Sequence, residues 1–165
     1  MRDVHSLASL TNNPSVSRYL LKVPYPYTDK EARRFIAHCQ KGERKKNRSE
    51  YVFAIESKVP KQVLGIISLT EVDQYQGTAV LGYWLGQSYW RRGIMYEACR
   101  RVLSFAFNVL KLRRINASVS ARNRASNNLI KKLGFAYEGT RRRAHRTKAT
   151  GQIDDTHIYG LLRDG

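Results

Sequence analysis

Six segments of the chain have the hydrophobic patterns of β-strands. The three in the first half are apolar with little alternation, as in strands whose two faces are both covered. A later segment alternates instead, with Ile115, Ala117 and Val119 set between polar residues. The predicted strands are residues 51–56, 63–70, 78–86, 114–120, 135–143 and 155–162.

Apolar residues at spacings of three and four predict helices before and between these strands. Asn13 and Pro14 suit the cap and the first position of a short helix, so the first helical segment should break there. Thr28 and Glu31 have the spacing of a capping box. The predicted helices are residues 4–21 with the break at Pro14, a long helix from Thr28 to the basic run 41–48, residues 93–111 and residues 125–133. This order of elements predicts one domain, residues 1–165, built as an α/β sandwich around a mixed sheet.

The composition excludes several classes of protein. No apolar stretch is long enough to span a bilayer, and no apolar core follows the first residues as it does in a signal peptide. The two cysteines, Cys39 and Cys99, fall on different predicted helices and form no pair with ligand spacing. The histidines outside the late basic segment also form no spaced set. We therefore expect a cytoplasmic protein without a disulfide, a metal or a membrane anchor.

The positive charge is concentrated in one part of the chain. The 165 residues include 30 Lys and Arg against 13 Asp and Glu, a net charge of +17. Between residues 89 and 148 the only acidic residues are Glu97 and Glu138. Such a field suits a polyanionic ligand, either a nucleic acid or a phosphorylated cofactor, although a basic surface can also be merely solvated.

A candidate phosphate site follows the third predicted strand. Gly82-Tyr83-Trp84-Leu85-Gly86 leads into Gln87-Ser88-Tyr89-Trp90, and Arg91-Arg92-Gly93-Ile94-Met95 then opens a long helix. Unpaired amides at a helix N-terminus favour phosphate oxygens, and a glycine lets the backbone approach a ligand closely. The spaced glycines of a Walker loop and of a dinucleotide fold are absent. A glycine that merely begins a helix is the alternative interpretation of this turn alone.

Two motifs in register resemble those of a known family. The segment from Gly82 to Ala98 resembles the coenzyme A-binding motif of GNAT acetyltransferases. Asn123-Arg124-Ala125-Ser126 with Leu133-Gly134-Phe135 resembles the second motif of the same family, one helix and one strand later. More narrowly, the chain is similar to the RimJ/RimL-like branch, which acetylates the α-amino groups of ribosomal proteins. The resemblance implies the GNAT fold, with a mostly antiparallel central sheet and helices on both faces, and acetyl-CoA as the cofactor.

The resemblance also assigns cofactor-binding roles. Backbone groups of Trp84 and Leu85 are expected to pair with the pantetheine arm as another strand does. Asn123 is expected to hydrogen-bond the pantetheine. Lys131 and Lys132 are candidates for the adenosine 3′-phosphate, or are simply solvated. The amides that are expected to hold the pyrophosphate belong to Arg91, Arg92, Gly93, Ile94 and Met95.

The chain departs from the family pattern in three places. Met95 stands where the family often has Gly or Ala, which suggests a less close backbone approach. Ile130 occupies the position of the usual general-acid tyrosine, so Ser126 is the candidate that assists the departing thiolate, unless it only satisfies the first turn of its helix. Without Ser126, the acid role falls to solvent or to a tyrosine such as Tyr83. The usual first strand is missing or shortened, so the strand at 51–56 should be an open edge. The N-terminal segment, a loop or a second copy of the chain could cover this edge, and the protein is expected to be a monomer or a homodimer.

The amine must be neutral when it attacks, and His145 is the first candidate for the general base. The basic residues that surround it in the sequence should lower its pKa. A water relay, or an exposed histidine without a catalytic role, is the alternative. Asp154, Asp155 and Glu71 are candidate anchors for the amine.

The expected reaction is transfer of the acetyl group to a protein N-terminus by direct attack in a ternary complex. The acceptor would lie on or near the ribosome, with RNA contact through the basic surface. Two alternatives remain open: acetylation of a small amine, such as a polyamine, an aminoglycoside or an amino-acid analogue, and a basic RNA-binding module that has lost catalysis.

Overall fold

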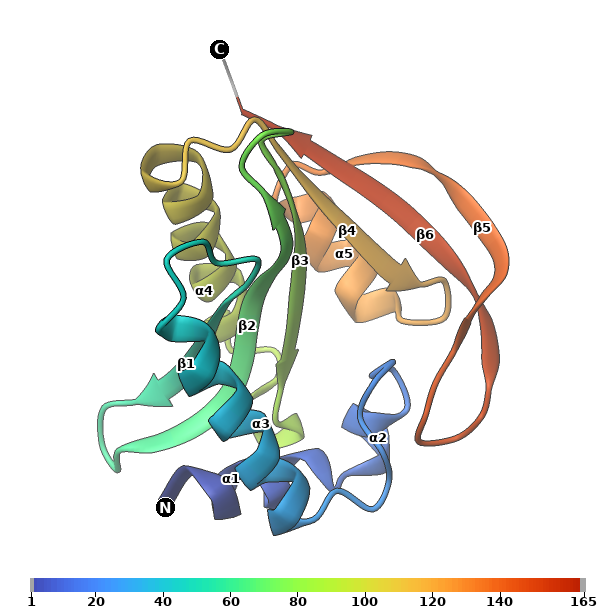
Figure 1. Cartoon of the computed structure of the whole chain (residues 1–165). Coiled ribbons are helices and arrows are strands. Elements are labelled where there is room, and N and C mark those ends of the chain that lie inside the picture. The colour runs from blue at the N-terminus through green and yellow to red at the C-terminus, as the bar shows by residue number, and fades with distance from the viewer. Residues whose placement is uncertain (1, 164–165) are drawn as a thin grey trace.

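The computed structural model describes residues 2–163 and contains one six-stranded sheet with the order β1-β2-β3-β4-β6-β5 (Figure 1). Every neighbouring pair is antiparallel except β3 and β4, which run parallel. The strands are β1 (Tyr51–Ser57), β2 (Gln62–Asp73), β3 (Thr78–Leu85), β4 (Arg114–Ser120), β5 (Ala136–Arg146) and β6 (Ile153–Leu162). The mixed, mostly antiparallel sheet confirms the predicted fold class.

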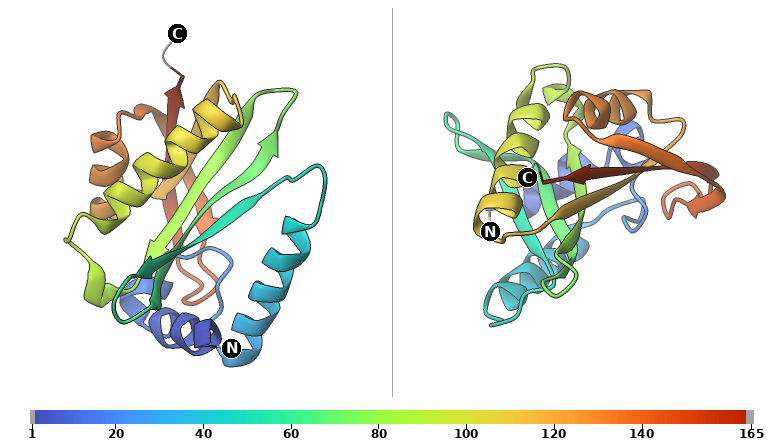
Figure 2. Two further views of the ribbon diagram at one scale, coloured as in Figure 1. Left: turned by 90° about the vertical axis from the view of Figure 1, so that its left-hand side faces the viewer. Right: turned by 90° about the horizontal axis from the view of Figure 1, so that it is seen from above.

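Helices cover both faces of the sheet (Figure 2). Val4 and Leu7 of α1 and Ala32 of α3 pack on one face in a small apolar cluster. The larger core lies on the other face, where α4 and α5 pack against β2, β3 and β4. The helices are α1 (Arg2–Thr11), α2 (Pro14–Ser17), α3 (Asp29–Glu43), α4 (Ile94–Ser104), which continues as a π-helical turn at Phe105–Val109, and α5 (Arg124–Lys132). A 3-10 turn, η1 (Gln87–Tyr89), precedes α4.

The predicted caps are present, but the first helical segment is shorter than expected. Asn13 caps α2 with Pro14 at its start, and Thr28 and Glu31 form the capping box of α3. The helix predicted to reach residue 21 ends at Ser17 instead. After this point the chain turns back, and the side chain of Asn12 hydrogen-bonds both backbone groups of Tyr27. A tertiary contact thus ends a segment whose apolar spacing would allow more helix.

The parallel pair β3 and β4 separates after a short contact. Only Thr78–Val80 of β3 pairs with Arg114–Asn116 of β4. From there β4 continues beside β6, while β3 continues beside β2, so the two halves of the sheet diverge (Figure 1). We call the region between the diverging ends of β3 and β4 the splay. It opens at the carboxyl ends of both strands, where the two sequence motifs begin.

The ladder between β2 and β3 determines which backbone groups face the splay. Leu85 lies opposite Gly65, and the Gly86 N–H donates to the Leu64 carbonyl at 2.9 Å. This bond belongs to the wide ring of an antiparallel ladder, so the backbone groups of Leu85 point away from β2. By the alternation of the strand, those of Tyr83 also point toward the splay, whereas those of Trp84 bond β2.

The strand β1 is the edge that the sequence predicted. It pairs only with β2, and no strand precedes α1 among residues 2–163. Phe53 of β1 is partly exposed, with its ring edge-on to Phe105. Whether a second copy of the chain covers this edge stays a prediction.

Candidate functional site

The turn before α4 has the backbone shape of an anion site. Arg91 and Gly93 are both left-handed, with φ of 60° and 75° on either side of Arg92. No described side chain caps α4, so its first amides have no partner within the helix. A Cβ atom built on Gly93 would meet no atom within 4 Å, so the backbone conformation, and not packing, requires glycine. Such curled backbones with free N–H groups bind anionic oxygens.

The side chains of this turn leave its outer surface open. Met95 is buried in the core against the sheet, and Ile94 packs partly against the same core. The Met95 side chain therefore points away from the amides and does not block them, contrary to the expectation of a less close backbone approach. Arg91 and Arg92 are exposed, and the Arg92 guanidinium lies 5.9 Å from the centre of the Tyr89 ring.

The first turn of α5 is joined to β3 across the splay. Asn123 caps α5, because its side-chain oxygen accepts from the Ser126 N–H at 3.1 Å. The Ser126 hydroxyl lies 2.7 Å from the hydroxyl of Tyr83. Ser126 is thus not held by its own helix alone. Tyr83, which the sequence analysis offered only in place of Ser126 and did not assign to the site, brings the two motifs together.

Lysine side chains of α5 reach toward the start of α4. Lys132 Nζ lies 4.8 Å from the centre of the Tyr96 ring, which belongs to the first turn of α4. Tyr96, Arg100 and Lys132 line a groove between α4, α5 and the end of β6. Lys131, on the same turn of α5, is exposed. A cation is therefore present at Lys132, beside the first turn of α4.

Known proteins are similar to this chain in sequence and in fold. The family model for the GNAT acetyltransferase domain matches residues 1–136. An uncharacterized N-acetyltransferase, p20 of Bacillus licheniformis, is 31% identical over 166 residues, which cover 99% of this chain and 89% of that protein. The chain belongs to the GNAT acetyltransferase family.

A more distant relative and a solved structure with a similar fold have names that give different acceptors. A ribosomal-protein-serine acetyltransferase of Escherichia coli is 27% identical over 103 residues, which cover 62% of this chain and 56% of that enzyme. A spermidine N-acetyltransferase from Vibrio cholerae, solved in complex with CoA and spermine, has a TM-score of 0.79 at 21% identity. That match covers 97% of this chain and 89% of the solved chain, and it shows a shared fold. The protein is therefore an acetyl-CoA-dependent N-acetyltransferase.

The ladder changes one residue of the cofactor site expected for this GNAT acetyltransferase. The backbone of Trp84 bonds β2, and its side chain packs with the apolar cluster of α1 and α3. Tyr83, and not Trp84, therefore presents backbone groups to the splay together with Leu85. The indole N–H of Trp90 donates to the Leu85 carbonyl at 2.7 Å. The groups that remain for a strand-like partner are the N–H and C=O of Tyr83 and the N–H of Leu85.

His145 lies on the other face of the sheet from α5. Its Nδ1 is 3.3 Å from the Thr156 hydroxyl, and Thr156 alternates along β6 with His157, which bonds Asn127 of α5. His145 is only 6% exposed, so it is not the exposed histidine of the alternative interpretation. Its Nε2 is the one buried side-chain nitrogen or oxygen of the described residues without a hydrogen-bond partner. Burial lowers the pKa of His145 below its usual 6.5, while the Asp154 carboxylate opposes this shift. The expected direction is confirmed, but the cause is burial and not the neighbouring arginines.

The carboxylate nearest to His145 is fully engaged. Asp154 is buried and forms an ion pair with Arg122 at 3.1 Å. It also accepts hydrogen bonds from Ser120 and Gln152, each at 3.0 Å. Asp154 is therefore part of the structure of the hairpin and is poorly suited to anchor a substrate amine.

Asn127 is a second residue that the sequence analysis missed. Its amide donates to the carbonyls of Ser120 and Asn123 and accepts from Tyr159 and His157. This buried residue joins the end of β4, α5 and β6, and so fixes the α5 terminus that carries Ser126. The only signal for Asn127 in the sequence is its position directly after Ser126 of the Asn-x-x-Ser motif.

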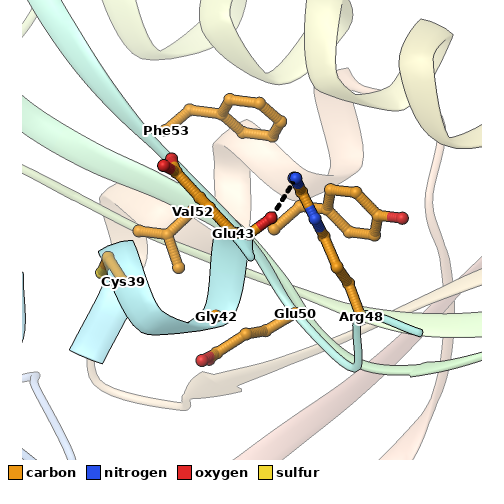
Figure 3. A pocket seen from close by; sticks show the side chains of 8 residues that line it. Cys39, Gly42, Glu43, Arg48, Glu50, Val52 and Phe53 are labelled. Atoms are coloured by element: carbon orange, nitrogen blue, oxygen red, sulfur yellow. Dashed lines mark hydrogen bonds between the residues drawn. The ribbon is translucent and has the colours of Figure 1, made fainter. Parts of the chain in front are cut away.

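Other features of the described chain lie outside this site. A small pocket between the end of α3 and β1 contains Cys39, Arg48 and Phe53, and none of its residues belongs to the two motifs (Figure 3). Between residues 2 and 163, no three His, Cys, Asp or Glu side chains are grouped to hold a metal ion. No helix in this part of the chain is long and apolar enough to cross a membrane.

Proposed function

We propose that this acetyltransferase modifies the N-terminal α-amino group of a protein, and that this protein is ribosomal. The supporting observation is the charge around His145. The Asp154 carboxylate beside it is paired with Arg122, and the same hairpin exposes Arg141, Arg142 and Arg143. A polyamine carries several positive charges and would be repelled from this face, whereas a peptide N-terminus brings one.

The two candidate catalytic residues fit the two ends of the reaction. His145 lies on the face of the sheet opposite α5. Its Nε2 has no hydrogen-bond partner but is buried, so a proton from the attacking amine would reach it through a water relay. Ser126 lies on the α5 side and can donate a hydrogen bond to the departing thiolate. A direct attack in a ternary complex needs these two functions on opposite sides of the thioester. An α-amine with a pKa near ~8 is already partly neutral at pH 7, so a weak base suffices.

The cofactor is assigned to the splay and to the turn before α4. Tyr83 and Leu85 offer backbone groups to the pantetheine, and the amides from Arg91 to Met95 offer N–H groups to the pyrophosphate. The Asn123 side-chain oxygen caps α5, which leaves its amide N–H₂ for the pantetheine. Lys132, beside Tyr96, is better placed than Lys131 for the 3′-phosphate.

A ribosomal acceptor also gives the exposed arginines a role. Proteins of the ribosome are surrounded by RNA, and arginines on an open edge strand can contact its phosphates. This surface consists of Arg141, Arg142, Arg143 and Arg146 of β5, and we call it the arginine edge. Such an acceptor implies the cytoplasm, as the sequence analysis expects.

The acceptor can be tested by competition in one reaction. Acetyl-CoA and the protein are incubated with peptides that carry the N-termini of ribosomal proteins, with the same peptides blocked at the α-amine, and with spermidine. Mass spectrometry is expected to find acetyl groups on the free α-amines and little on blocked peptides. A higher kcat/KM for spermidine than for every peptide would replace the proposal with small-amine acetylation.

A further inference from the structure

The contact between Tyr83 and Ser126 has no role in the assignments above. The two hydroxyls are 2.7 Å apart, and both side chains are partly buried. Tyr83 projects from β3, at a point where β3 has already separated from β4, toward the first turn of α5. The Tyr83 phenol therefore crosses the splay and contacts Ser126, the residue proposed to stabilise the departing thiolate.

Either hydroxyl could be the donor in this hydrogen bond, and the environment of Tyr83 keeps the phenol able to donate. Burial raises the pKa of the phenol well above its usual value near 10, and the bond to Ser126 only partly offsets the rise. The phenol is therefore protonated at neutral pH and can donate to the serine oxygen. A serine that accepts this bond keeps its own O–H for another acceptor. The hydrogen bond thus restricts the rotation of both hydroxyl groups and gives the Ser126 O–H a defined direction.

We propose that Tyr83 is a positioning residue that aims the Ser126 O–H at the sulfur of the departing thiolate. The inference rests on the proposed role of Ser126. As the amine nitrogen bonds the acetyl carbon, the carbon–sulfur bond breaks and its electron pair remains on sulfur. Ser126 stabilises that charge by a hydrogen bond, the amine proton leaves to His145 or to water, and Tyr83 keeps its proton throughout.

A double-mutant cycle tests this coupling. Tyr83→Phe, Ser126→Ala and the double variant are compared in the single-turnover rate of acetyl transfer at saturating acetyl-CoA. Tyr83→Phe is expected to lower the rate about 10-fold to 100-fold, because the serine loses its fixed orientation. The double variant should be no slower than Ser126→Ala, since Tyr83 acts through the serine. Affinity for acetyl-CoA, measured by calorimetry, should change little.

A matched control separates this role from a loss of structure. The hydroxyl of Tyr137 also lies 2.7 Å from a neighbouring hydroxyl, that of Thr140, on the exposed edge strand. Tyr137→Phe removes a similar bond outside the site and should leave the rate unchanged. Full activity of Tyr83→Phe would overturn the proposal. So would losses that multiply in the double variant, or a Ser126→Ala variant that remains fully active.

The choice of acceptor keeps this test independent of the proposed substrate. The thiolate leaves in the same way for any amine, so the cycle can use whichever amine the protein acetylates fastest. A preference for spermidine would overturn the substrate proposal and leave the cycle measurable. If the rate losses of the two single variants multiply in the double variant, with a peptide as acceptor, the role of Tyr83 is overturned and the substrate proposal is left intact.

Discussion

At the scale of single residues, His145 and Ser126 differ in burial and in their hydrogen-bond partners. Ser126 has a protein partner for its hydroxyl and remains partly exposed. His145 is buried, and only one of its ring nitrogens has a partner. A buried imidazole without an ion pair of its own favours the neutral form. This is the form that a general base needs, and it connects the stability of the protein to pH.

The lowered pKa of His145 should be measurable as a loss of stability in acid. Because its pKa is lower in the folded state than the usual 6.5, the unfolded chain binds the proton more readily. The contribution is fully present above about pH 6.5 and declines as pH falls toward the folded pKa, by at most about 1.4 kcal/mol per pH unit. We therefore expect the wild type to lose more free energy of unfolding than His145→Gln between pH 7.5 and pH 5.5, as measured in urea.

The exposed His5 gives the control for this comparison. His5→Gln should follow the wild type at both pH values. Parallel curves for the wild type and His145→Gln would show that the buried imidazole is not the group that responds to acid.

The site residues differ in how well the sequence could predict them. Ser126 and Gly93 belong to motifs with a fixed local spacing, and their positions follow from the turns that those motifs form. Tyr83 contacts Ser126, which is 43 residues away in the sequence. Asn127 contacts His157, which is 30 residues away. No local pattern encodes such partners, because the divergence of two strands brings them together. For Trp84 the expectation was wrong by one residue, since the phase of the ladder depends on the pairing with β2.

The elements themselves were largely predictable. Alternation and capping residues placed six strands and the main helices, because local hydrogen bonding and one-sided burial determine both. The three-residue contact between β3 and β4 was not predictable, because strand patterns do not reveal where pairing stops. The turn before α4 combines both cases. Its glycine is visible in the sequence, but the left-handed backbone of Arg91 is not.

Substitution of Gly93 tests the turn as an element. Gly93→Val is expected to weaken acetyl-CoA binding at least tenfold, because the branched side chain stands before the amides and the residue must leave its left-handed conformation. Calorimetry on the folded variant measures this affinity.

Gly151 provides the matched control, since it is also left-handed, with φ of +67°, and a Cβ there meets no atom within 4 Å. Gly151→Val carries the same backbone strain in the β5–β6 hairpin and should bind acetyl-CoA normally. Equal affinities of the two variants would contradict the assignment of the pyrophosphate to the turn.

At the scale of the whole molecule, the distribution of positive charge supports the proposed contact with a polyanion. The positive residues of α4, α5 and the arginine edge lie within one stretch of sequence, and β5 ends the sheet on the side away from β1. Arg143 has a left-handed backbone, and its N–H donates to the Asp155 carboxylate at 2.8 Å. A bulge in the β5–β6 ladder thus fixes consecutive arginines outside the regular pairing.

Removal of three of the four arginines of the arginine edge should weaken RNA binding in a salt-dependent way. Replacing Arg141, Arg142 and Arg143 by glutamine is expected to reduce affinity for a ribosomal RNA fragment and to lower the slope of log K against log salt by roughly 2 to 3, since each lost phosphate contact contributes about 0.7 to 0.9. Fluorescence anisotropy at salt concentrations from about 50 to about 200 mM measures both the affinity and the salt slope.

A second triple variant controls for net charge. Arg44, Lys45 and Lys46 are exposed at the end of α3, and their replacement by glutamine removes the same three charges. Equal effects of the two triple variants would mean that the RNA senses total charge and has no preferred surface.

The splay also connects the concentration of a metabolite to the lifetime of the protein. Beyond Val80, the larger part of β3 has no strand beside it on the β4 side, and the backbone groups of Tyr83 are the ones proposed to bind the pantetheine. A ligand that binds only the folded state adds RT ln(1 + [L]/Kd) to the free energy of unfolding, about 2.7 kcal/mol at 100 times Kd. Acetyl-CoA therefore acts as a stabiliser as well as a substrate. We therefore expect a low supply of acetyl-CoA to leave a larger fraction of the enzyme unfolded and open to degradation.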